Sequence, residues 1–286
     1  MSSSSRLRDS LSAGSSVLMP GVWDPLSALL AESAGFDTVF LSGFALAGTL
    51  LGEPDIGIIG QAEMADAARR VCAAVPGMNV VVDADTGYGS TSAVARTVEL
   101  WEQAGAAGMF LEDQEWPKKC GHMDGKQVVD RDEWLTKLRT ALRTRSGLHV
   151  TARTDARAVV SLDEAITRGK MARDLGVDAV FVEAPQSVVE METIAAALPD
   201  IILVANMVEK GKTPLLTPAE LADLGFRLIV SPLSGLLSAT RALADAYARL
   251  RREGSMRDHL GDLTSFDDFT AIVGLPKHLA NEQLDR

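Results

Sequence analysis

The sequence is poor in cysteine and has no long apolar run. Its 286 residues include only two cysteines, Cys72 and Cys120, which can form neither a disulfide framework nor a four-cysteine zinc site and which favour a reducing compartment. No run of about 18 apolar residues is present, so no membrane span is expected. The polar start at residues 1–5 is followed by Arg6 and Arg8 rather than by the apolar core of a signal peptide. We therefore expect a cytoplasmic protein.

Positive charge is also scarce. The chain has 28 lysines and arginines against 39 aspartates and glutamates, a formal net charge of -11. This balance disfavours nucleic acids and anionic membranes as partners. A small anionic substrate remains compatible with it, because a local group of Lys, Arg and metal reverses the field inside one cleft.

The motif Gly-x-Gly-x-x-Gly is absent as well, which argues against a doubly wound nucleotide-binding sheet. Instead, eight short runs, most of them rich in Val, Ile, Leu or Phe, alternate with longer amphipathic segments, a pattern typical of strands buried on both faces. The predicted strands are residues 16–19, 38–42, 79–83, 109–112, 149–153, 179–183, 202–206 and 228–230. Helical patterns cover residues 25–34, 92–104 and 161–175, and Gly105 and Gly176 follow the last two at positions suited to helix C-caps.

Eight strand–helix units in a chain of this length predict an α/β fold of the (β/α)8 TIM-barrel type. We expect residues 1–286 to form a single barrel domain. In residues 255–286 the pattern changes, and residues 265–285 are predicted to be helical. We expect this C-terminal helical extension to serve in oligomerisation.

The most distinctive segment is Trp-Pro-Lys-Lys-Cys-Gly-His at residues 116–122. It places Cys120 between two lysines and a histidine, and nearby cations stabilise a thiolate. The surrounding segment 113–130 is too long and irregular for a simple strand–helix connection and is predicted to be a lid. Cys72 lies in a helical run at residues 64–74 and is predicted to be a small buried hydrophobic side chain.

Polar residues gather where the predicted strands end, which in a barrel is the catalytic rim. They are Ser42, Asp83, Asp85, Glu112, Asp113, Arg153, Asp155, Glu183, Asn206 and Glu209. Acids without histidine suit a hard cation, Mg²⁺ above all, and alternation along an extended chain places Asp83 and Asp85 on one side. Singly, Asp83 is also explained as a helix cap, Asp85 and Asp55 as turn residues, and Glu183 as a cap or as the partner of a barrel lysine. Arg153 is also explained as a structural partner of Glu112 or Glu183. Their recurrence at successive strand ends favours a site.

Together these motifs resemble the isocitrate lyase and phosphoenolpyruvate mutase superfamily. The matching stretches are residues 82–89, 112–114, 118–122, 152–156 and 205–209. The most similar branch contains petal death protein, 2,3-dimethylmalate lyase and carboxyvinyl-carboxyphosphonate phosphonomutase. Phosphoenolpyruvate mutases proper have asparagine at the position of Cys120, and methylisocitrate lyases have an arginine soon after the position of His122, where this chain has Met123-Asp124-Gly125.

The resemblance implies a set of roles for particular residues. Mg²⁺, or Mn²⁺ in its place, would bind through Asp85 with Asp83, Glu112 and Asp55 around it. Cys120 would donate a proton, with Lys118 and His122 orienting the second carboxylate and tuning the thiol, and Arg153 and Glu112 would complete the catalytic set. The implied substrate-binding residues are Ser42, Gly43, Phe44, Gly121, Arg153, Glu183 and Asn206. The resemblance further implies a homotetramer, a dimer of dimers in which the eighth barrel helix is swapped between subunits.

The expected activity is Mg²⁺-dependent cleavage of a carbon–carbon bond in a 2-hydroxy dicarboxylate of the substituted malate type. The products would be an α-oxo acid and a carboxylate, and oxaloacetate hydrolysis is a further activity expected of this branch. The alternatives are a carboxyvinyl-carboxyphosphonate phosphonomutase, a methylisocitrate lyase, and a barrel without catalytic activity that binds small oxo acids.

Overall fold

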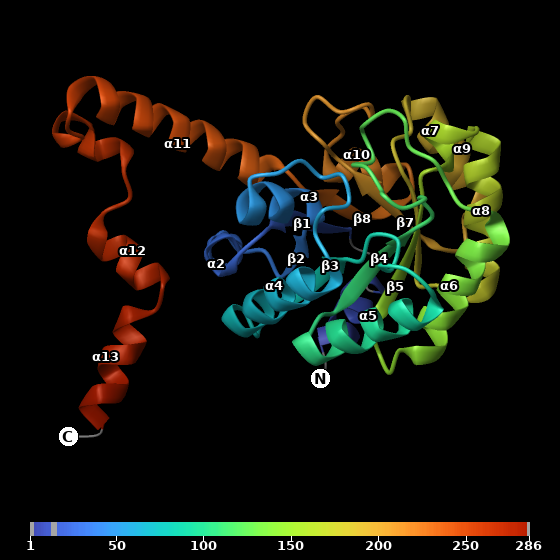
Figure 1. Ribbon diagram of the computed structural model, residues 1–286, viewed down its shortest axis with the longest axis horizontal. Helices are drawn as coiled ribbons and strands as arrows, with labels where there is room; N and C mark the ends of the chain where they lie inside the picture. Colours follow the sequence, from blue (N-terminus) through green and yellow to red (C-terminus); the bar gives the residue numbers. More distant parts are fainter. Residues whose placement is uncertain (1–2, 13–15, 285–286) are drawn as a thin grey trace.

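Eight parallel strands close into a barrel in a computed structural model of the protein, which describes residues 3–12 and 16–284 (Figure 1). The strands are β1 (Val17–Val22), β2 (Thr38–Leu41), β3 (Asn79–Asp83), β4 (Gly108–Glu112), β5 (His149–Thr154), β6 (Ala179–Val182), β7 (Ile202–Asn206) and β8 (Phe226–Ser231). Each strand pairs with the next, and β1 pairs with β8 to close the ring. All eight predicted strands and the TIM-type fold are therefore confirmed.

The barrel interior is filled by aromatic and aliphatic side chains. Phe40 and Phe110 stack with ring centroids 4.9 Å apart, and Phe181 meets Phe110 edge-on at 5.5 Å. At the other end of the same interior cluster lie Leu7 and Leu11 of helix α1 (Ser3–Ser12), both fully buried. The interior is thus a packed core, and its aromatic layer forms the floor beneath the strand carboxyl ends.

Helices form the outer layer of the barrel (Figure 1). They are α2 (Pro25–Ser33), α4 (Gln61–Ala74), α5 (Thr91–Ala104), α6 (Arg131–Thr144), α8 (Leu162–Leu175), α9 (Val188–Ala197) and α10 (Pro218–Asp223), with the short α3 (Gly43–Leu46), a π-helical turn at Ala47–Leu51, and α7 (Ala156–Val159) at the rim. Gly105 and Gly176 end α5 and α8 with φ of 91° and 87°, the left-handed conformation predicted for C-caps. Among the helices so described, none combines the length and the apolar character that crossing a bilayer requires.

The C-terminal part of the chain leaves the barrel. Helix α11 (Ser234–Glu253) has no buried residue and projects away from the barrel (Figure 1). A 3₁₀ turn at Arg257–Asp262 leads to α12 (Phe266–Ile272) and α13 (Leu275–Leu284). The predicted helical extension is confirmed, but it is broken at Gly274, whose φ of 84° ends α12. Residue 285, the last of that prediction, lies outside the described residues.

Candidate active site

A cavity opens at the carboxyl ends of the strands, above the aromatic floor. Its lining includes most of the predicted site residues: Ser42, Phe44, Asp55, Asp83, Lys118, Cys120, Gly121, His122, Arg153, Glu183 and Asn206. Gly43, Asp85 and Glu112 lie directly behind this lining, in contact with Asp83, Lys118 and Arg153 respectively. Tertiary folding therefore gathers the whole predicted set at one end of the barrel.

One side of the cavity is an acidic cluster around Lys118. The Lys118 ammonium lies 2.5 Å from Asp55 Oδ1 and 2.7 Å from Asp85 Oδ1, and all three side chains are nearly inaccessible. We expected Lys118 to orient a substrate carboxylate and to tune the thiol. Its ammonium is instead committed to these two carboxylates, because segment 113–130 folds back onto the loop that contains Asp55, where Cys120 N–H donates to the Asp55 carbonyl.

The acidic cluster has more negative charge than Lys118 balances. Burial raises the pKa of Asp85, and the carboxylates of Asp83 and Asp55 raise it further against the opposing effect of the ammonium. The same acids raise the pKa of Lys118 despite its burial. Asp85 Oδ2 and Glu112 Oε1 are buried without a hydrogen-bond partner among the described residues. A cluster in this state favours additional positive charge.

These residues fit Mg²⁺. Within residues 3–12 and 16–284, no three acidic, imidazole or thiol groups are gathered tightly enough to bind a metal by themselves. Mg²⁺ does not need such a cage, since it usually binds through one or two carboxylates and keeps several waters. The all-oxygen donor set and the unpartnered Asp85 Oδ2 meet this requirement.

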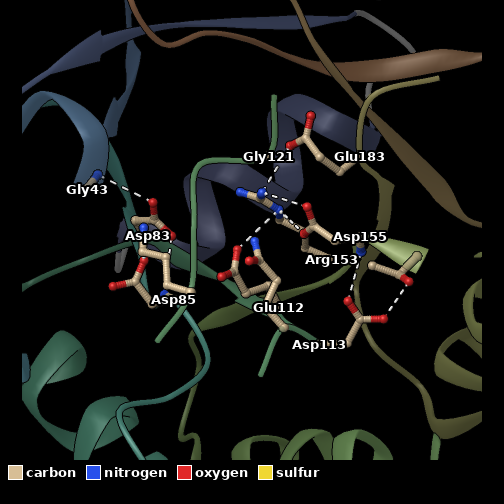
Figure 2. Close-up of polar contacts among 12 residues, drawn as sticks. Gly43, Asp83, Asp85, Glu112, Asp113, Gly121, Arg153, Asp155 and Glu183 are labelled. Atoms are coloured by element: carbon tan, nitrogen blue, oxygen red, sulfur yellow. Dashed lines mark hydrogen bonds and ion pairs between the residues drawn. The ribbon is translucent and has the colours of Figure 1, made fainter. Parts of the chain in front are cut away.

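The two aspartates of Asp83-Ala84-Asp85 converge for a reason other than the predicted alternation. Asp85 is not extended: its φ is 42°, in the left-handed region that is costly for a non-glycine residue. Asp83 supports this turn by accepting from Asp85 N–H at 3.2 Å and, with its other oxygen, from Gly43 N–H at 3.3 Å (Figure 2). Backbone strain of this kind is typical of functional sites. Gly43 was expected to bind substrate, but its N–H donates to Asp83 in this structure.

The opposite side of the cavity is organised around Arg153. Its guanidinium lies 3.3 Å from Glu112, 3.0 Å from Asp155 and 3.3 Å from Glu183 (Figure 2), and 5.3 Å above the Phe181 ring. Arg153 is thus a structural partner of both Glu112 and Glu183 and also lines the cavity. Burial raises the pKa of Glu112 well above its usual value, against the opposing charge of Arg153.

The surroundings of Cys120 favour the thiol, the form needed by a proton donor, over the thiolate that the flanking cations would favour. Burial raises the pKa of its thiol to about 11, and the neighbouring carboxylates of Asp55 and Glu183 act in the same direction. The flanking lysines do not oppose this, because Lys118 contacts acids and the Lys119 ammonium donates to the Gly125 carbonyl at 3.0 Å. Cys72, as predicted, is buried in α4, and burial raises its pKa to about 12.

Segment 113–130, the predicted lid, contacts the loop after β7. His122 Nδ1 accepts from Lys212 N–H at 3.0 Å, so its proton is on Nε2, 3.3 Å from Glu183 Oε1. Asn206 Nδ2 donates to the same glutamate at 3.2 Å. At the surface, the Lys212 ammonium pairs with Asp124 at 2.6 Å. His122 therefore connects the lid to the loop after β7 and to Glu183.

Sequence reasoning assigned no role to three buried residues next to the site. Lys126 Nζ lies 2.7 Å from Asp155 Oδ1, and Asp113 accepts from Asp155 N–H at 2.8 Å and from Thr154 Oγ1 at 2.6 Å. The sequence did indicate the two aspartates, because each comes just after a predicted strand that ends in a polar residue. Lys126 had only its place in the lid, because nothing local predicts that a lysine in a polar loop will be buried.

Comparison with known proteins identifies the family. Residues 7–251 match the family described as phosphoenolpyruvate phosphomutase. The chain is 46% identical over 264 residues to the chloroplastic carboxyvinyl-carboxyphosphonate phosphorylmutase of Arabidopsis thaliana, covering 91% of this chain and 78% of that protein. It is 44% identical to petal death protein of Dianthus caryophyllus (91% and 82% covered) and 37% identical to 2,3-dimethylmalate lyase of Eubacterium barkeri (97% and 96% covered).

Solved structures agree with this assignment. Oxaloacetate acetylhydrolase bound to 3,3-difluorooxalacetate superposes with a TM-score of 0.94 at 36% identity, covering 99% of this chain and 96% of that chain. 2,3-Dimethylmalate lyase gives 0.95 at 34% identity (100% and 96% covered). Phosphonopyruvate hydrolase in complex with oxalate and Mg²⁺ gives 0.89 at 27% identity (99% of each chain). The chain therefore belongs to the phosphoenolpyruvate mutase and isocitrate lyase superfamily of enzymes, in the branch that resembles petal death protein and 2,3-dimethylmalate lyase.

Proposed function

We propose that the protein is a Mg²⁺-dependent carbon–carbon lyase that cleaves a 2-hydroxy dicarboxylate of the substituted malate type to an α-oxo acid and a carboxylate. One observation supports this most directly: a protonated thiol, Cys120, lines the same cavity as a buried arginine, Arg153, and the acidic cluster. Lyase chemistry of this kind needs an anion-binding group, a charge-stabilising centre and a proton donor around one ligand.

Asp85 would hold the ion, with Asp83, Asp55 and Glu112 around it, and Mn²⁺ is the alternative ion. When bound, Mg²⁺ would supply Lewis-acid stabilisation of negative charge on the C2 oxygen. These carboxylates lie within contact distance of Lys118, so the ammonium would share the cluster with the ion or move aside.

The chain's own residues would perform the remaining work. Arg153 would bind the C1 carboxylate, and the Ser42 hydroxyl would donate to the same group. Glu112 would accept the C2 hydroxyl proton; the C2–C3 bond would then break with its electron pair on C3. Cys120 Sγ would deliver its proton to C3. The lid would exclude water meanwhile, so that protonation by the thiol is the only fate of the carbanion.

The remaining cavity residues would hold the part of the substrate that becomes the second product. Glu183 and Asn206 line this region together with His122 and Gly121 of the lid. Phe44 contributes an apolar wall, which suits an alkyl substituent. The substituent is the part of the substrate that differs among malate-type compounds, so these residues would set its size.

A substrate panel tests this proposal. The purified protein with Mg²⁺ would be assayed against 2,3-dimethylmalate, other substituted malates, oxaloacetate and methylisocitrate, with release of pyruvate or another oxo acid as the readout. We expect a substituted malate to be cleaved fastest. Fastest turnover of methylisocitrate would assign the methylisocitrate lyase alternative, and failure to cleave any member or to bind Mg²⁺ with oxalate would favour a barrel without catalytic activity.

A phosphonomutase activity is the second candidate. It is favoured by the 46% identity to a carboxyvinyl-carboxyphosphonate phosphorylmutase. In that activity phosphoryl transfer replaces carbon–carbon cleavage, and ³¹P NMR with carboxyphosphonoenolpyruvate distinguishes the two. Appearance of a new phosphinate resonance at a rate above the lyase rate would replace the first proposal with this one.

We further propose that the C-terminal extension assembles the protein into a homotetramer, a dimer of helix-swapped dimers. The extension is rich in exposed apolar side chains, among them Leu260, Phe266 and Phe269, which are 66%, 80% and 45% exposed. Large apolar side chains concentrated in one exposed segment are typical of protein–protein contacts. A second copy would cover α11–α13 and receive the same helices in return.

Removing residues 255–286 is expected to lower the oligomeric state. Sedimentation velocity should show a tetramer for the full chain and a smaller species for the truncated chain, because the apolar extension is the surface that the truncation deletes. Phe266→Ser with Phe269→Ser is the milder variant, and Arg257→Ser, an exposed change in the same segment, is its control. A truncated chain that still sediments as the same oligomer as the full chain would contradict the proposal.

We also propose a cytoplasmic location. Cys72 and Cys120 are both free thiols, which is compatible with a reducing compartment.

A further inference from the structure

Lys126 is a buried cation in the C-terminal part of the lid segment 113–130. Its side chain is 1% exposed, and its ammonium donates to the Gly121 carbonyl and to Asp155 Oδ1, the latter at 2.7 Å. A lysine is almost never fully buried unless it is paired, and removing its charge from water is costly. Because burial is costly, a buried and paired Lys126 is better explained by a specific role than by packing alone.

One contact of Lys126 acts on Arg153 through Asp155. Asp155 accepts from Arg153 Nε at 3.0 Å and from Nη2 at 3.3 Å while it also binds Lys126 (Figure 2 shows the Arg153 contacts). The single guanidinium faces the carboxylates of Glu112, Asp155 and Glu183. Without Lys126, three buried acids would share one cation. With Lys126 present, Asp155 pairs with a second cation. The positive charge of Arg153 is then less fully balanced by acids and can bind an anionic ligand.

The other contact acts on the lid. Gly121 lies so close to the cavity wall that a Cβ there would come within 2.6 Å of Arg153 Nη2 and of the Glu183 side chain. The Lys126 ammonium holds the carbonyl of this glycine in place. Cys120 precedes Gly121 directly, so a shift of the glycine backbone moves the thiol as well. Lys126 thus contacts both the lid backbone and the acid that orients the arginine.

We propose that Lys126 is a positioning residue that couples lid closure to the anion-binding state of Arg153. By holding Gly121 it places Cys120 over the cavity, and by pairing with Asp155 it keeps Arg153 available to an anionic ligand. The inference rests on the proposed function for one point, that the ligand of Arg153 is an oxo-acid carboxylate. The Lys126 ammonium itself neither contacts the substrate nor transfers a proton in this role.

The first experiment measures the lid without any substrate. Lys126→Met and wild type are treated with iodoacetamide, and alkylation of each cysteine is followed by peptide mass spectrometry. We expect Cys120 to react several-fold faster in Lys126→Met, because the lid opens more often. Cys72, buried in α4, should react at its wild-type rate, which shows that the fold is intact. Lys170→Met, the same change at an exposed position of α8, should leave both rates unchanged.

The second experiment measures ligand binding. Oxalate affinity in the presence of Mg²⁺, determined by calorimetry, is expected to fall by about 10–100-fold in Lys126→Met, the usual effect of losing a group that orients a ligand-binding side chain. Asp155→Asn removes the charge that Lys126 balances. The double variant should therefore lose less affinity than the product of the two single losses, a coupling that independent structural roles would not produce.

The outcomes separate this inference from the proposed function. Equal acceleration of Cys72 and Cys120 alkylation would show general destabilisation and overturn the inference, as would unchanged Cys120 alkylation in Lys126→Met. Wild-type oxalate affinity in Lys126→Met would overturn the coupling to Arg153. Failure of the wild type to bind oxalate with Mg²⁺ would count against the proposed function instead, and the alkylation rates would still decide the role of Lys126 in the lid.

Discussion

Replacement of Cys120 by alanine is expected to lower kcat by about 10²–10⁴-fold, the usual effect of removing a general acid, while the binding of Mg²⁺ and oxalate stays near wild type. Turnover and binding are expected to separate because two different parts of the chain form the cavity. The thiol lies on the lid, whereas the groups expected to hold the ion and the carboxylate, Asp85 and Arg153, lie on the barrel. Steady-state kinetics with the best substrate of the panel measures the loss of turnover. Calorimetry with oxalate measures the binding of the ion and the ligand separately from it.

Two further variants sharpen this result. Cys120→Ser keeps a proton at nearly the same position but on a much weaker acid, so it should retain little of the lost rate. Cys72→Ala changes the other thiol, which lies in α4 outside the cavity lining, and should turn over normally. Wild-type turnover by Cys120→Ala would remove the thiol from the mechanism and with it the proposed route of protonation.

Replacement of Asp85 by asparagine is expected to abolish binding of Mg²⁺ and oxalate together without unfolding the protein. Asp85 is buried beside the like charges of Asp83 and Asp55, and burial raises its pKa. Removing its charge relieves that repulsion, and Lys118 keeps Asp55 as a partner. The unliganded variant should therefore unfold at or above the wild-type temperature.

The measurement is thermal unfolding with and without Mg²⁺ and oxalate. A ligand at 100 times its Kd stabilises a protein by about 2.7 kcal/mol, so the wild type should show a clear rise in Tm and Asp85→Asn almost none. Asp223→Asn, an exposed aspartate at the end of α10, is the matched control and should keep the full rise. Retention of the ligand-induced rise in Asp85→Asn would show that the ion binds elsewhere.

The barrel could be predicted because its signals are local. Each strand is a short apolar run such as Asn79–Asp83, all five residues of which are buried, and the C-cap glycines of α5 and α8 have the expected left-handed conformation. Helix α1 was missed, although Leu7 and Leu11 are spaced four residues apart and so lie on one helical face. Four consecutive serines before Arg6 concealed that pattern.

The membership of the site was also predictable, because residues at strand carboxyl ends meet on one rim of a barrel. What each residue does there was less so. The lysine expected beside the thiol pairs with Asp55, 63 positions away in the chain, and burial raises the pKa of the Cys120 thiol instead of lowering it. The two aspartates converge through a left-handed turn at Asp85 rather than through strand alternation.

The sequence alone determined the architecture, the list of polar residues at its rim and the family resemblance, since these depend on periodicity and on residue type within short windows. Only the tertiary structure decided which charges pair and which groups lose water. Lys126 is buried against Asp155, and Cys120, itself on the lid, lines the cavity near Glu183, because distant segments close over one another. Protonation state and ion pairing depend on that proximity and on the exclusion of solvent, and neither property is encoded in any local stretch of the chain.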